Sequence, residues 1–466
     1  MNELTCMSAA RLAALIRRRE VSPEEVVAAY LRQIERVNPE LNAVVTINEW
    51  ALDCAWEAQA AVMGGRELGP LHGVPVTVKD TIETVGLRTT SGTRLRAGFV
   101  PEKGATVIRR LRAAGAIILG KTNVPEMAIP YECVNPLFGR TNNPHDLSLT
   151  SGGSSGGEAA CVSACLSAAG LGSDLSGSIR VPAHFCGVAG LKPTIGRVPS
   201  DGHFPPATGA FALGAVVGPM ARYVEDLSLF LSVLTGTGAH RESMRSNAAL
   251  DVRGLQVAQF VDESTPVSVE THSAIEAAMR ALADAGLVVV DERPPGLERA
   301  IDLWPALFSG ASTTQLRELY GDNEEEAGPV VRAVLAAADK SQASAPGEFA
   351  RAVAERDSLR DSLLQWMSTT PLIVAPVGSV PAFEHGARRV EVGGRQLSVF
   401  RAFGYSRAAN VLGLPAVSVP AGRTREGLPV GVQLIGRPFE EETVLAAAAI
   451  IEASLGGWVR PPIMKP

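Results

Sequence analysis

The sequence predicts an α/β fold, in which one large domain holds a mixed central β-sheet covered by helices on both faces. Apolar runs typical of strands alternate with helical patterns, as in the strand–helix–strand unit expected over residues 255–260, 273–285 and 287–290. Apolar residues make up 46% and charged residues 20%, which excludes a disordered chain. No internal repeat or linker divides the 466 residues. We therefore expect a single unit over 1–466, although length alone favours about three domains.

The N-terminal third combines helices with the first strands. The first 60 residues are expected to be helical, and SPEE at 22–25 supplies a cap, a proline at N1 and a glutamate at N3 for a helix over 26–37. The Asn38-Pro39 pair is expected to end that helix. Alternating valines predict a strand over 71–80 that ends on Lys79 and Asp80.

The rest of the chain continues the alternation of helices and strands. Residues 235–250 are polar and predict a loop, and 299–368 are mostly helical with an acidic solvated turn at 322–326. The other expected elements are a helix at 106–114, a strand at 116–119, an Ala-rich helix at 158–169, strands at 371–376 and 416–420, and a closing helix at 440–455.

Charge and cysteine usage exclude several classes of protein. A net charge of −6 argues against a nucleic-acid partner, and no run of apolar residues is long enough for a membrane span. The first 20 residues lack the apolar core of a signal peptide. None of the six cysteines forms a C-x-x-C pair, and Cys161 and Cys165 are expected to share a helix face as buried, reduced thiols. These observations predict a cytoplasmic protein.

One segment matches a nucleotide-binding motif without its mechanism. GAIILGKT at 115–122 fits the P-loop pattern, but a P-loop needs an exposed turn between a strand and a helix. The four central residues are apolar and favour a strand, and Pro125 disfavours a helix that continues from 122. We interpret the segment as a buried strand that ends at a glycine turn, with Lys121 and Lys192 structural.

A second match, GGSSG at 152–156, fits the nucleophile-elbow pattern of Ser-His-Asp hydrolases. An elbow follows a strand, whereas NNPH at 142–145 predicts a loop. None of the seven histidines has a context that marks a catalytic base, although such a hydrolase stays an alternative. No His or carboxylate recurs at metal-ligand spacing, so neither a metal nor another cofactor is expected.

Three unusual segments suit acyl transfer without histidine: GVPVTVKD at 73–80, SGGSSGGEAA at 151–160 and GSDLSGSIRVP at 172–182. A serine hydroxyl needs a base to become a nucleophile, and a lysine serves when burial lowers its pKa. A second hydroxyl can relay the proton, and Gly-rich turns leave backbone N–H groups free for an oxyanion. Only six of the 43 basic residues are lysines, so Lys79 stands out in a chain that otherwise uses arginine.

The chain resembles the amidase signature family, nearest in motif to its fatty-acid-amide-hydrolase-like bacterial members. GVPVTVKD, GKTNVPE, GRTNNPHDLSLTSGGSSGGEAA, SIRVPAHFCGVAGLKPT, GPMARYVEDL and GLPVGVQLIGRPF occur in the family's order. The resemblance implies that Lys79 is the base, Ser154 a bridging serine in a cis peptide, and Ser178 the acylated nucleophile. The reaction implied is hydrolysis of a small-molecule amide to an acid and an amine or ammonia.

The resemblance also implies supporting groups around the nucleophile. The backbone amides expected to hold the oxyanion belong to Leu175, Ser176, Gly177 and Ser178. Asp174 and Arg180 are expected either to support catalysis or to pin the loop as a buried ion pair. The recognisable core spans about 70–235, the region at about 299–368 is expected to shape the acyl pocket, and Tyr131 is a pocket candidate.

Three alternatives stay open at this point. The family usually has two glycines before the nucleophile, and Ser176-Gly177 stands there instead; an inactive scaffold is therefore a rival hypothesis. A positive φ at Ser176 would cost about 1 kcal/mol, whereas a negative φ makes the change harmless. The second alternative is that the chain is the A subunit of a tRNA-dependent amidotransferase, an assembly partner that releases ammonia from glutamine. That subunit shares the two serines and the lysine. That protein has MDEFAMGS and SIRQP where this chain has VPEMAIPY and Val181. Homodimerisation is also left open.

Overall fold

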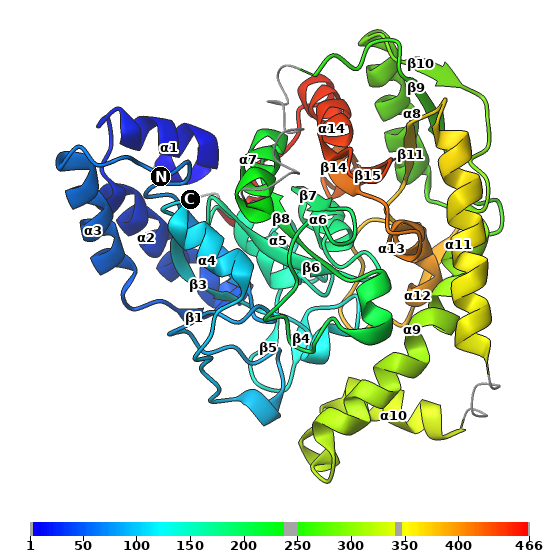
Figure 1. The fold of residues 1–466 in the computed structure, drawn as a ribbon, viewed down its shortest axis with the longest axis horizontal. Coiled ribbons are helices and arrows are strands. Elements are labelled where there is room, and N and C mark those ends of the chain that lie inside the picture. The colour runs from blue at the N-terminus through cyan, green and yellow to red at the C-terminus, as the bar shows by residue number, and fades with distance from the viewer. Residues whose placement is uncertain (1–2, 237–249, 341–346, 465–466) are drawn as a thin grey trace.

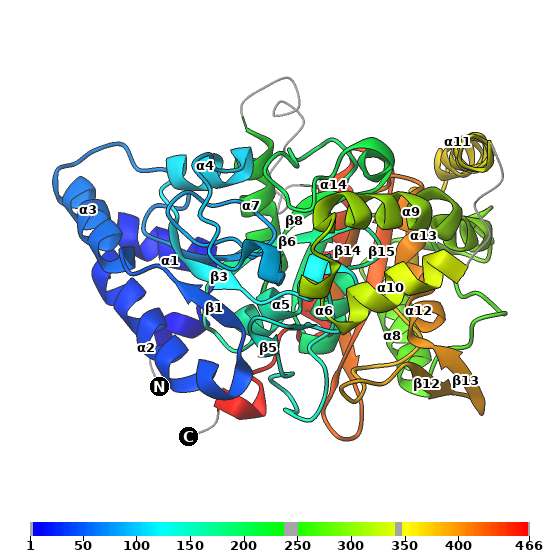
Figure 2. The same cartoon turned by 90° about the horizontal axis from the view of Figure 1, so that it is seen from below.

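The computed structural model describes residues 3–236, 250–340 and 347–464. Its centre is a mixed eleven-stranded sheet, and helices lie on both sides of it (Figures 1 and 2). The order of strands across the sheet is β1 (Val44–Ile47), β3 (Ile117–Thr122), β2 (Pro75–Lys79), β6 (Ala169–Asp174), β8 (Val216–Ala221), β7 (Ala189–Lys192), β14 (Ala416–Arg423), β15 (Pro429–Gly436), β11 (Leu372–Pro376), β9 (Gln256–Gln259) and β10 (Val288–Val290). The predicted α/β fold with a large mixed sheet is confirmed.

The helices follow the strands along most of the chain. They are α1 (Ala9–Arg17), α2 (Pro23–Leu41), α3 (Ala51–Met63), α4 (Thr106–Ala113), α5 (Gly156–Ser163), α6 (Arg180–Cys186), α7 (Val224–Thr235), α8 (Val269–Asp284), α9 (Leu297–Tyr320), α10 (Pro329–Lys340), α11 (Glu348–Met367), α12 (Val399–Ala402), α13 (Arg407–Val411) and α14 (Glu441–Leu455). Two small hairpins, β4 (Val134–Asn135) with β5 (Gly139–Arg140) and β12 (Arg389–Val392) with β13 (Arg395–Ser398), lie outside the sheet. No helix of the described residues is long and apolar enough to cross a bilayer.

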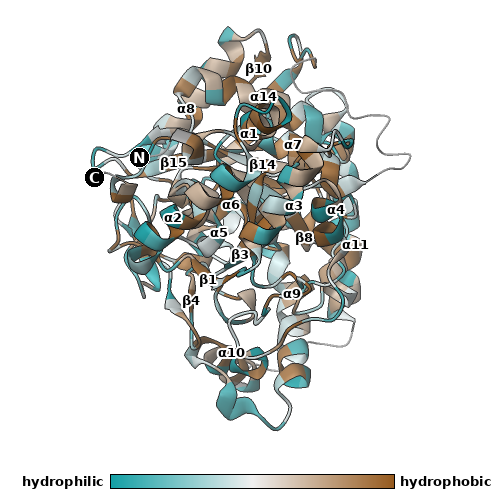
Figure 3. Ribbon diagram, turned by 90° about the vertical axis from the view of Figure 1, so that its left-hand side faces the viewer, coloured by the Kyte–Doolittle hydropathy of each residue, from teal (hydrophilic) through white to brown (hydrophobic). Residues whose placement is uncertain are grey.

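Packing on the two sides of the sheet makes the core. Helices α8 and α14 pack on each other and on β14, whereas α5 and α6 pack together and contact β8 and β15 respectively. Hydrophobic residues gather in the central strands (Figure 3), and every residue of β2, β3, β6, β8 and β15 is buried. A sheet covered in this way places its functional side chains at the ends of its strands.

The strand pairing sets the position of the site. Strands β2 and β6 are parallel neighbours, with Val78 opposite Leu171. Lys79 and Asp174, the last residues of these strands, therefore lie at the same end of the two strands, their carboxyl ends. The backbone N–H of Ser155, at the start of α5, donates to the carbonyl of Ser178 at 3.0 Å. Segments that are far apart in sequence thus meet at the carboxyl ends of β2 and β6.

The predicted unit of strand, helix and strand near residue 270 is confirmed, because β9 and β10 are parallel and flank α8. The predicted end of a helix at Asn38-Pro39 is wrong, since α2 continues to Leu41. Asn38 stabilises this last turn by accepting the backbone N–H groups of Ala43 and Val44, both at 2.8 Å. Pro39 has no N–H to donate, yet the helix continues for two residues beyond it.

Two other boundaries differ from the prediction. Strand β3 does not end at a glycine turn but continues through Gly120 to Thr122. Glycine is required there because a Cβ at residue 120 would overlap the carbonyl oxygen of Thr46 on β1. The Ala-rich helix is shorter than expected, and Cys165 lies beyond its end with a φ of 58°. Cys161 and Cys165 therefore do not share a helix face. Most of the loop predicted at 235–250 lies outside the described residues.

Candidate active site

Lys79 ends β2 as a fully buried side chain with a hydroxyl partner. Its Nζ donates to Ser154 Oγ at 2.6 Å and approaches the carbonyl of Ser173 at 3.4 Å. Burial lowers the pKa of Lys79 to about 7, against the opposing pull of the Asp174 carboxylate. A lysine with such a pKa is neutral in a large fraction of molecules near neutral pH, and a neutral amine can accept a proton.

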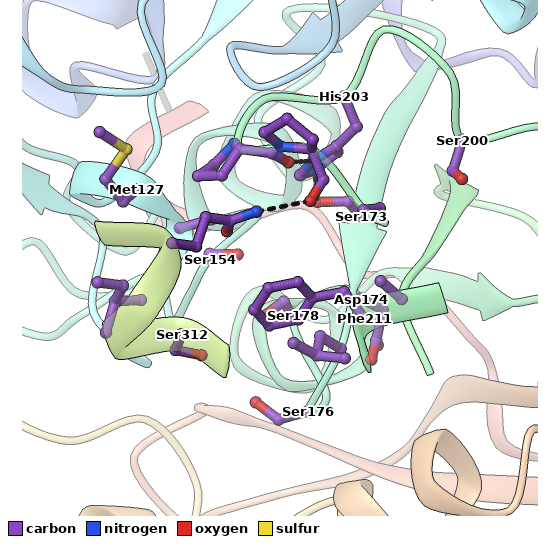
Figure 4. A pocket seen from close by; sticks show the side chains of 18 of the residues that line it. Met127, Ser154, Ser173, Asp174, Ser176, Ser178, Ser200, His203, Phe211 and Ser312 are labelled. Atoms are coloured by element: carbon purple, nitrogen blue, oxygen red, sulfur yellow. Dashed lines mark hydrogen bonds between the residues drawn. The ribbon is translucent and has the colours of Figure 1, made fainter. Parts of the chain in front are cut away.

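Ser154 and Ser178 line one cavity and come from two different loops (Figure 4). The peptide bond between Gly153 and Ser154 is cis, as the resemblance implied. Ser178 is 8% exposed and lies on the loop between β6 and α6, residues 175–179, called here the β6–α6 loop. Within the described chain, no hydrogen bond joins the hydroxyl of Ser178 to that of Ser154, so the structure brings the two serines to one cavity without connecting them.

Asp174 and Arg180 anchor the β6–α6 loop at both ends. The Arg180 guanidinium donates to both carboxylate oxygens of Asp174, at 3.0 and 3.1 Å, and the pair is fully buried. The carboxylate also accepts the backbone N–H groups of Gly177 at 2.8 Å and Ile179 at 3.0 Å. Burial alone would raise the pKa of Asp174, but Arg180 and the Ile179 amide together hold it well below its ordinary value. This geometry agrees with the loop-pinning interpretation of the pair.

The amides of the β6–α6 loop are only partly free for an oxyanion. The N–H of Gly177 donates to the Asp174 carboxylate at 2.8 Å, and its place in the oxyanion hole stays a prediction. The amides of Leu175, Ser176 and Ser178 donate no hydrogen bond within the described residues. Gly177 has a φ of 106°, whereas Ser176 is absent from the residues with positive φ. Serine at 176 therefore imposes no left-handed backbone, and the departure from two glycines is harmless to the loop's conformation.

Two aromatic side chains hold the carbonyl groups of this loop. The Trp304 indole N–H donates to the carbonyl of Leu175 at 3.0 Å, and the Tyr131 hydroxyl donates to that of Ser176 at 2.6 Å. In a trans peptide the carbonyl and the next N–H point in opposite directions. Trp304 thereby orients the N–H of Ser176, and Tyr131 orients that of Gly177. Sequence reasoning proposed Tyr131 as a pocket residue and missed the role of Trp304, because no pattern along the chain reports a side chain 129 positions away.

The cavity beside the two serines has a volume of 150 Å³ and a mostly apolar wall. A wider outer cavity of 1320 Å³ shares wall residues with it, among them Ser176 and Trp304, and Tyr131 borders this outer cavity. Residues of α9 and α10 contribute to the inner wall, so the segment expected to shape the pocket does border it. These wall residues are Trp304, Ser312, Gln315, Leu316 and Val334.

His203 also faces the inner cavity, a placement that sequence reasoning missed (Figure 4). Its Nδ1 lies 2.8 Å from the carbonyl of Pro205, and its Nε2 lies 2.9 Å from Ser173 Oγ. Burial lowers the pKa of His203 to about 4. The ring is therefore neutral above that pH, with Nδ1 donating to the carbonyl and Nε2 accepting from Ser173. It adds no positive charge beside Lys79.

Glu158, on α5, is buried against β2 and β3. Its carboxylate accepts the hydroxyls of Thr77 and Thr122. A Cβ at Gly170 would overlap this carboxylate, which explains the glycine in β6. Burial raises the pKa of Glu158 to about 7. Among the described residues, no group of three His, Cys, Asp or Glu side chains could hold a metal ion.

Comparison with known proteins places this site in a family. The profile of the family named Amidase matches residues 25–445. Fatty-acid amide hydrolase 2-A of Danio rerio is 32% identical, over 99% of this chain and 91% of that protein. The A subunit of glutamyl-tRNA(Gln) amidotransferase from Carboxydothermus hydrogenoformans is 33% identical, over 97% of each.

The solved structures agree. A 6-aminohexanoate cyclic dimer hydrolase superposes with a TM-score of 0.86 and 28% identity over the whole of both chains. A bacterial aryl acylamidase of the amidase signature enzymes superposes with a TM-score of 0.84 and 27% identity over 96% of each chain. With its sheet, its lysine–serine contact and its sequence all in agreement, the chain belongs to the amidase family.

Proposed function

We propose that this amidase hydrolyses a neutral carboxylic amide through an acyl-enzyme on Ser178. The observation that carries the proposal is the 2.6 Å contact between the buried amine of Lys79 and Ser154 Oγ, in the cavity that Ser178 also lines. A lysine with a lowered pKa is a competent base for a serine. The family membership supports a hydrolase that acts on the C–N bond of amides.

The proposed reaction is a proton relay in two directions. Neutral Lys79 accepts the proton of Ser154, and Ser154 accepts the proton of Ser178 as Ser178 Oγ attacks the amide carbon. The free N–H groups of Leu175, Ser176 and Ser178 are the candidates to stabilise the resulting oxyanion. The relay then returns a proton to the leaving nitrogen as the C–N bond breaks. Water attacks the ester, and the acid is released with Ser178 reprotonated.

The cavity wall favours an uncharged substrate over glutamine. Asp174 is the one charged side chain among the described residues of the inner wall, and Arg180 already engages it. A free amino acid carries an ammonium and a carboxylate, and burial of either without a partner is costly. The match to an amidotransferase leaves a glutaminase reaction as the second candidate function. Comparing turnover of glutamine, an anilide and a fatty amide separates the two.

Labelling with a fluorophosphonate tests the proposed nucleophile. We expect the native protein to be labelled at Ser178, and Ser178→Ala to lose both the label and amide hydrolysis. Ser176→Ala is the matched control, because it removes a neighbouring hydroxyl and leaves the relay in place. Absence of labelling in the native protein would instead support the inactive scaffold.

We further propose that the protein acts in the cytoplasm on a small molecule, without a nucleic-acid partner. The net charge of −6 supports the absence of nucleic-acid binding. Homodimerisation stays open, and sedimentation equilibrium of the purified protein tests it.

A further inference from the structure

A pair of thiols outside the active site lies at the junction of the N-terminal segment and the core. Cys6 ends the short 3-10 helix Glu3–Cys6, and its Sγ lies 3.6 Å from Sγ of Cys165. Cys165 is fully buried between α5 and β6, whereas Cys6 is half-buried and open to solvent. The thiol of Cys165 donates its hydrogen to the sulfur of Cys6. A small solute can therefore reach the sulfur of Cys6, whereas the sulfur of Cys165 is buried behind it.

The backbone around Cys6 is held in place on several sides. The Tyr223 hydroxyl donates to the carbonyl of Cys6 at 3.1 Å, and the Arg222 guanidinium donates to that of Met7 at 2.8 Å. The Tyr30 hydroxyl donates to the carbonyl of Thr5 at 3.0 Å. These bonds hold the backbone of residues 5–7 against the core, with Cys6 Sγ 3.6 Å from Cys165 Sγ. The two sulfurs must approach by about 1.5 Å to reach the length of a disulfide bond.

Positive charge surrounds the more exposed sulfur. The Arg460 guanidinium approaches Cys6 Sγ at 3.3 Å, and Arg222 lies buried nearby. The hydrogen bond from Cys165, with help from Arg460 and Arg222, lowers the pKa of Cys6 to about 5 in spite of partial burial. Burial raises the pKa of Cys165 well above its ordinary value. The pair thus combines an accessible thiolate with a neutral thiol in contact, which is the arrangement of an attacking and a resolving cysteine.

We propose that Cys6 and Cys165 form a peroxide-reactive thiol pair that closes a disulfide between the N-terminal segment and the core. The Cys6 thiolate attacks one oxygen of a hydroperoxide, the O–O bond breaks, and the leaving oxygen takes a proton to become water or an alcohol. The product is the sulfenic acid of Cys6. The sulfur of Cys165 then attacks this sulfur, and the displaced hydroxide leaves as water with the proton of Cys165. Overall, two thiols are oxidised by two electrons and one peroxide is reduced.

The test treats the whole reduced protein with one equivalent of hydrogen peroxide and maps its peptides without reduction. We expect a peptide pair joined through Cys6 and Cys165, lighter by two hydrogen atoms, and no sulfenic acid trapped by dimedone. Cys165→Ser should instead accumulate a dimedone adduct on Cys6. Cys54, a partly exposed thiol whose pKa burial raises, is the internal control and should stay reduced.

Two results would overturn the proposal. One is a native protein in which dimedone traps Cys6 after peroxide treatment, since Cys165 would then not resolve it. The other is a Cys6 that reacts with peroxide no faster than Cys54. Arg460→Gln provides a variant that leaves both thiols in place. It should raise the pKa of Cys6 and move the midpoint of the pH dependence of Cys6 oxidation to higher pH, because the thiolate loses its nearest cation.

Discussion

At the scale of single residues, the proposed chemistry depends on where one amine is buried. Lys79 has no carboxylate in salt-bridge contact among the described residues, so desolvation dominates and lowers its pKa to about 7. Lys121, on the neighbouring strand, lies 3.9 Å from Asp80 and donates to Thr89 Oγ1. Its pKa is lowered by burial to about 8, and it does not contact a cavity serine. The partner of each amine, more than its burial, thus separates the two roles.

The lowered pKa of Lys79 gives a pH profile with a defined sign. A base works only when deprotonated, and the neutral fraction of Lys79 rises as pH rises through about 7. We expect kcat/KM for an uncharged amide to increase from about pH 5.5 and to level off above about pH 8. Initial rates across that range, with an amide that does not titrate, check this. A rate independent of pH would show that another group is the base.

Replacing the amine with an apolar side chain of similar length separates chemistry from stability. Lys79→Met should lower kcat/KM by about 10²–10⁴-fold, the usual worth of a general base. The thermal midpoint should not fall, because a buried amine is replaced by a group that has no desolvation cost. The control is Lys103→Met, at a lysine outside the cavity wall, which should leave the rate unchanged. A Lys79→Met enzyme that keeps native activity contradicts the assignment.

At the scale of elements, α9 both lines the inner cavity and contacts the β6–α6 loop that carries Ser178. This helix carries Leu316 and Gln315 on the cavity wall, and it also carries Trp304, whose indole holds the Leu175 carbonyl. Trp304 packs its ring on Phe308 and Phe400, so its position is fixed by neighbours on two elements. The orientation of the Ser176 amide therefore depends on the position of α9.

Removing the indole N–H tests this connection. Trp304→Phe keeps an aromatic ring and loses the donor to Leu175, so we expect kcat to fall by about tenfold while KM changes little, since a misdirected oxyanion donor acts in the transition state. The matched control is Trp366→Phe, which loses an indole hydrogen bond to Glu292 on the surface. Equal kcat values for the two variants would remove Trp304 from the positioning of the loop.

A glycine in β3 makes a prediction about stability. Gly120→Ala places a methyl group against the Thr46 carbonyl and should destabilise the protein by about 1–3 kcal/mol, because β1 must move from the sheet edge. Gly98→Ala is the control, since a Cβ there meets no atom within 4 Å. Urea unfolding of both variants measures the difference. A Gly120→Ala protein as stable as the Gly98→Ala protein would contradict the close contact.

At the scale of the whole molecule, three buried lysines link stability to pH. Burial lowers the pKa of Lys79 and Lys192 to about 7 and that of Lys121 to about 8. The unfolded chain binds protons at these lysines up to about pH 10.4, so it holds more protons than the native state above about pH 7. The free energy of unfolding should therefore rise with pH, by up to about 1.4 kcal/mol per pH unit for each lysine.

This rise should be visible between about pH 7.5 and pH 8.5. At higher pH the cysteines that are buried in the native state ionise in the unfolded chain, and this ionisation opposes the rise in the free energy of unfolding. Urea titrations at several pH values within that window measure the slope for the native protein. The same titrations on Lys79→Met should give a shallower slope, because one of the three sites is gone. Parallel slopes would mean that Lys79 is charged in the folded state.

The sequence predicted much of this molecule, and the failures have local causes. Periodicity located β2, α8 and α14 because each buries a regular set of apolar residues. It failed in β3 and α5, where close contacts made by Gly120 and the turn at Cys165 decide the boundaries. Lys79, Ser154 and Ser178 were identified from motifs that resemble a family.

The connections among these segments could not be predicted in the same way. Trp304, His203 and the engagement of the Gly177 amide depend on contacts between segments far apart in sequence. A side chain that donates to a distant carbonyl leaves no periodic signal in its own element. The resemblance therefore supplied the candidate reacting groups, whereas the contacts that hold them are visible only in the structure.

The hydrogen bond from Trp304 to the β6–α6 loop has a consequence for how this fold could acquire a new substrate selectivity. Residues 305–340 form much of the wall of the outer cavity, and no side chain among them has a polar bond to the β6–α6 loop in the described structure. A protein engineer could randomise the wall positions of that stretch as a library and leave the reaction chemistry intact. Position 304 is the boundary of such a library, because Trp304 contacts the β6–α6 loop and we expect a change there to alter turnover for every substrate.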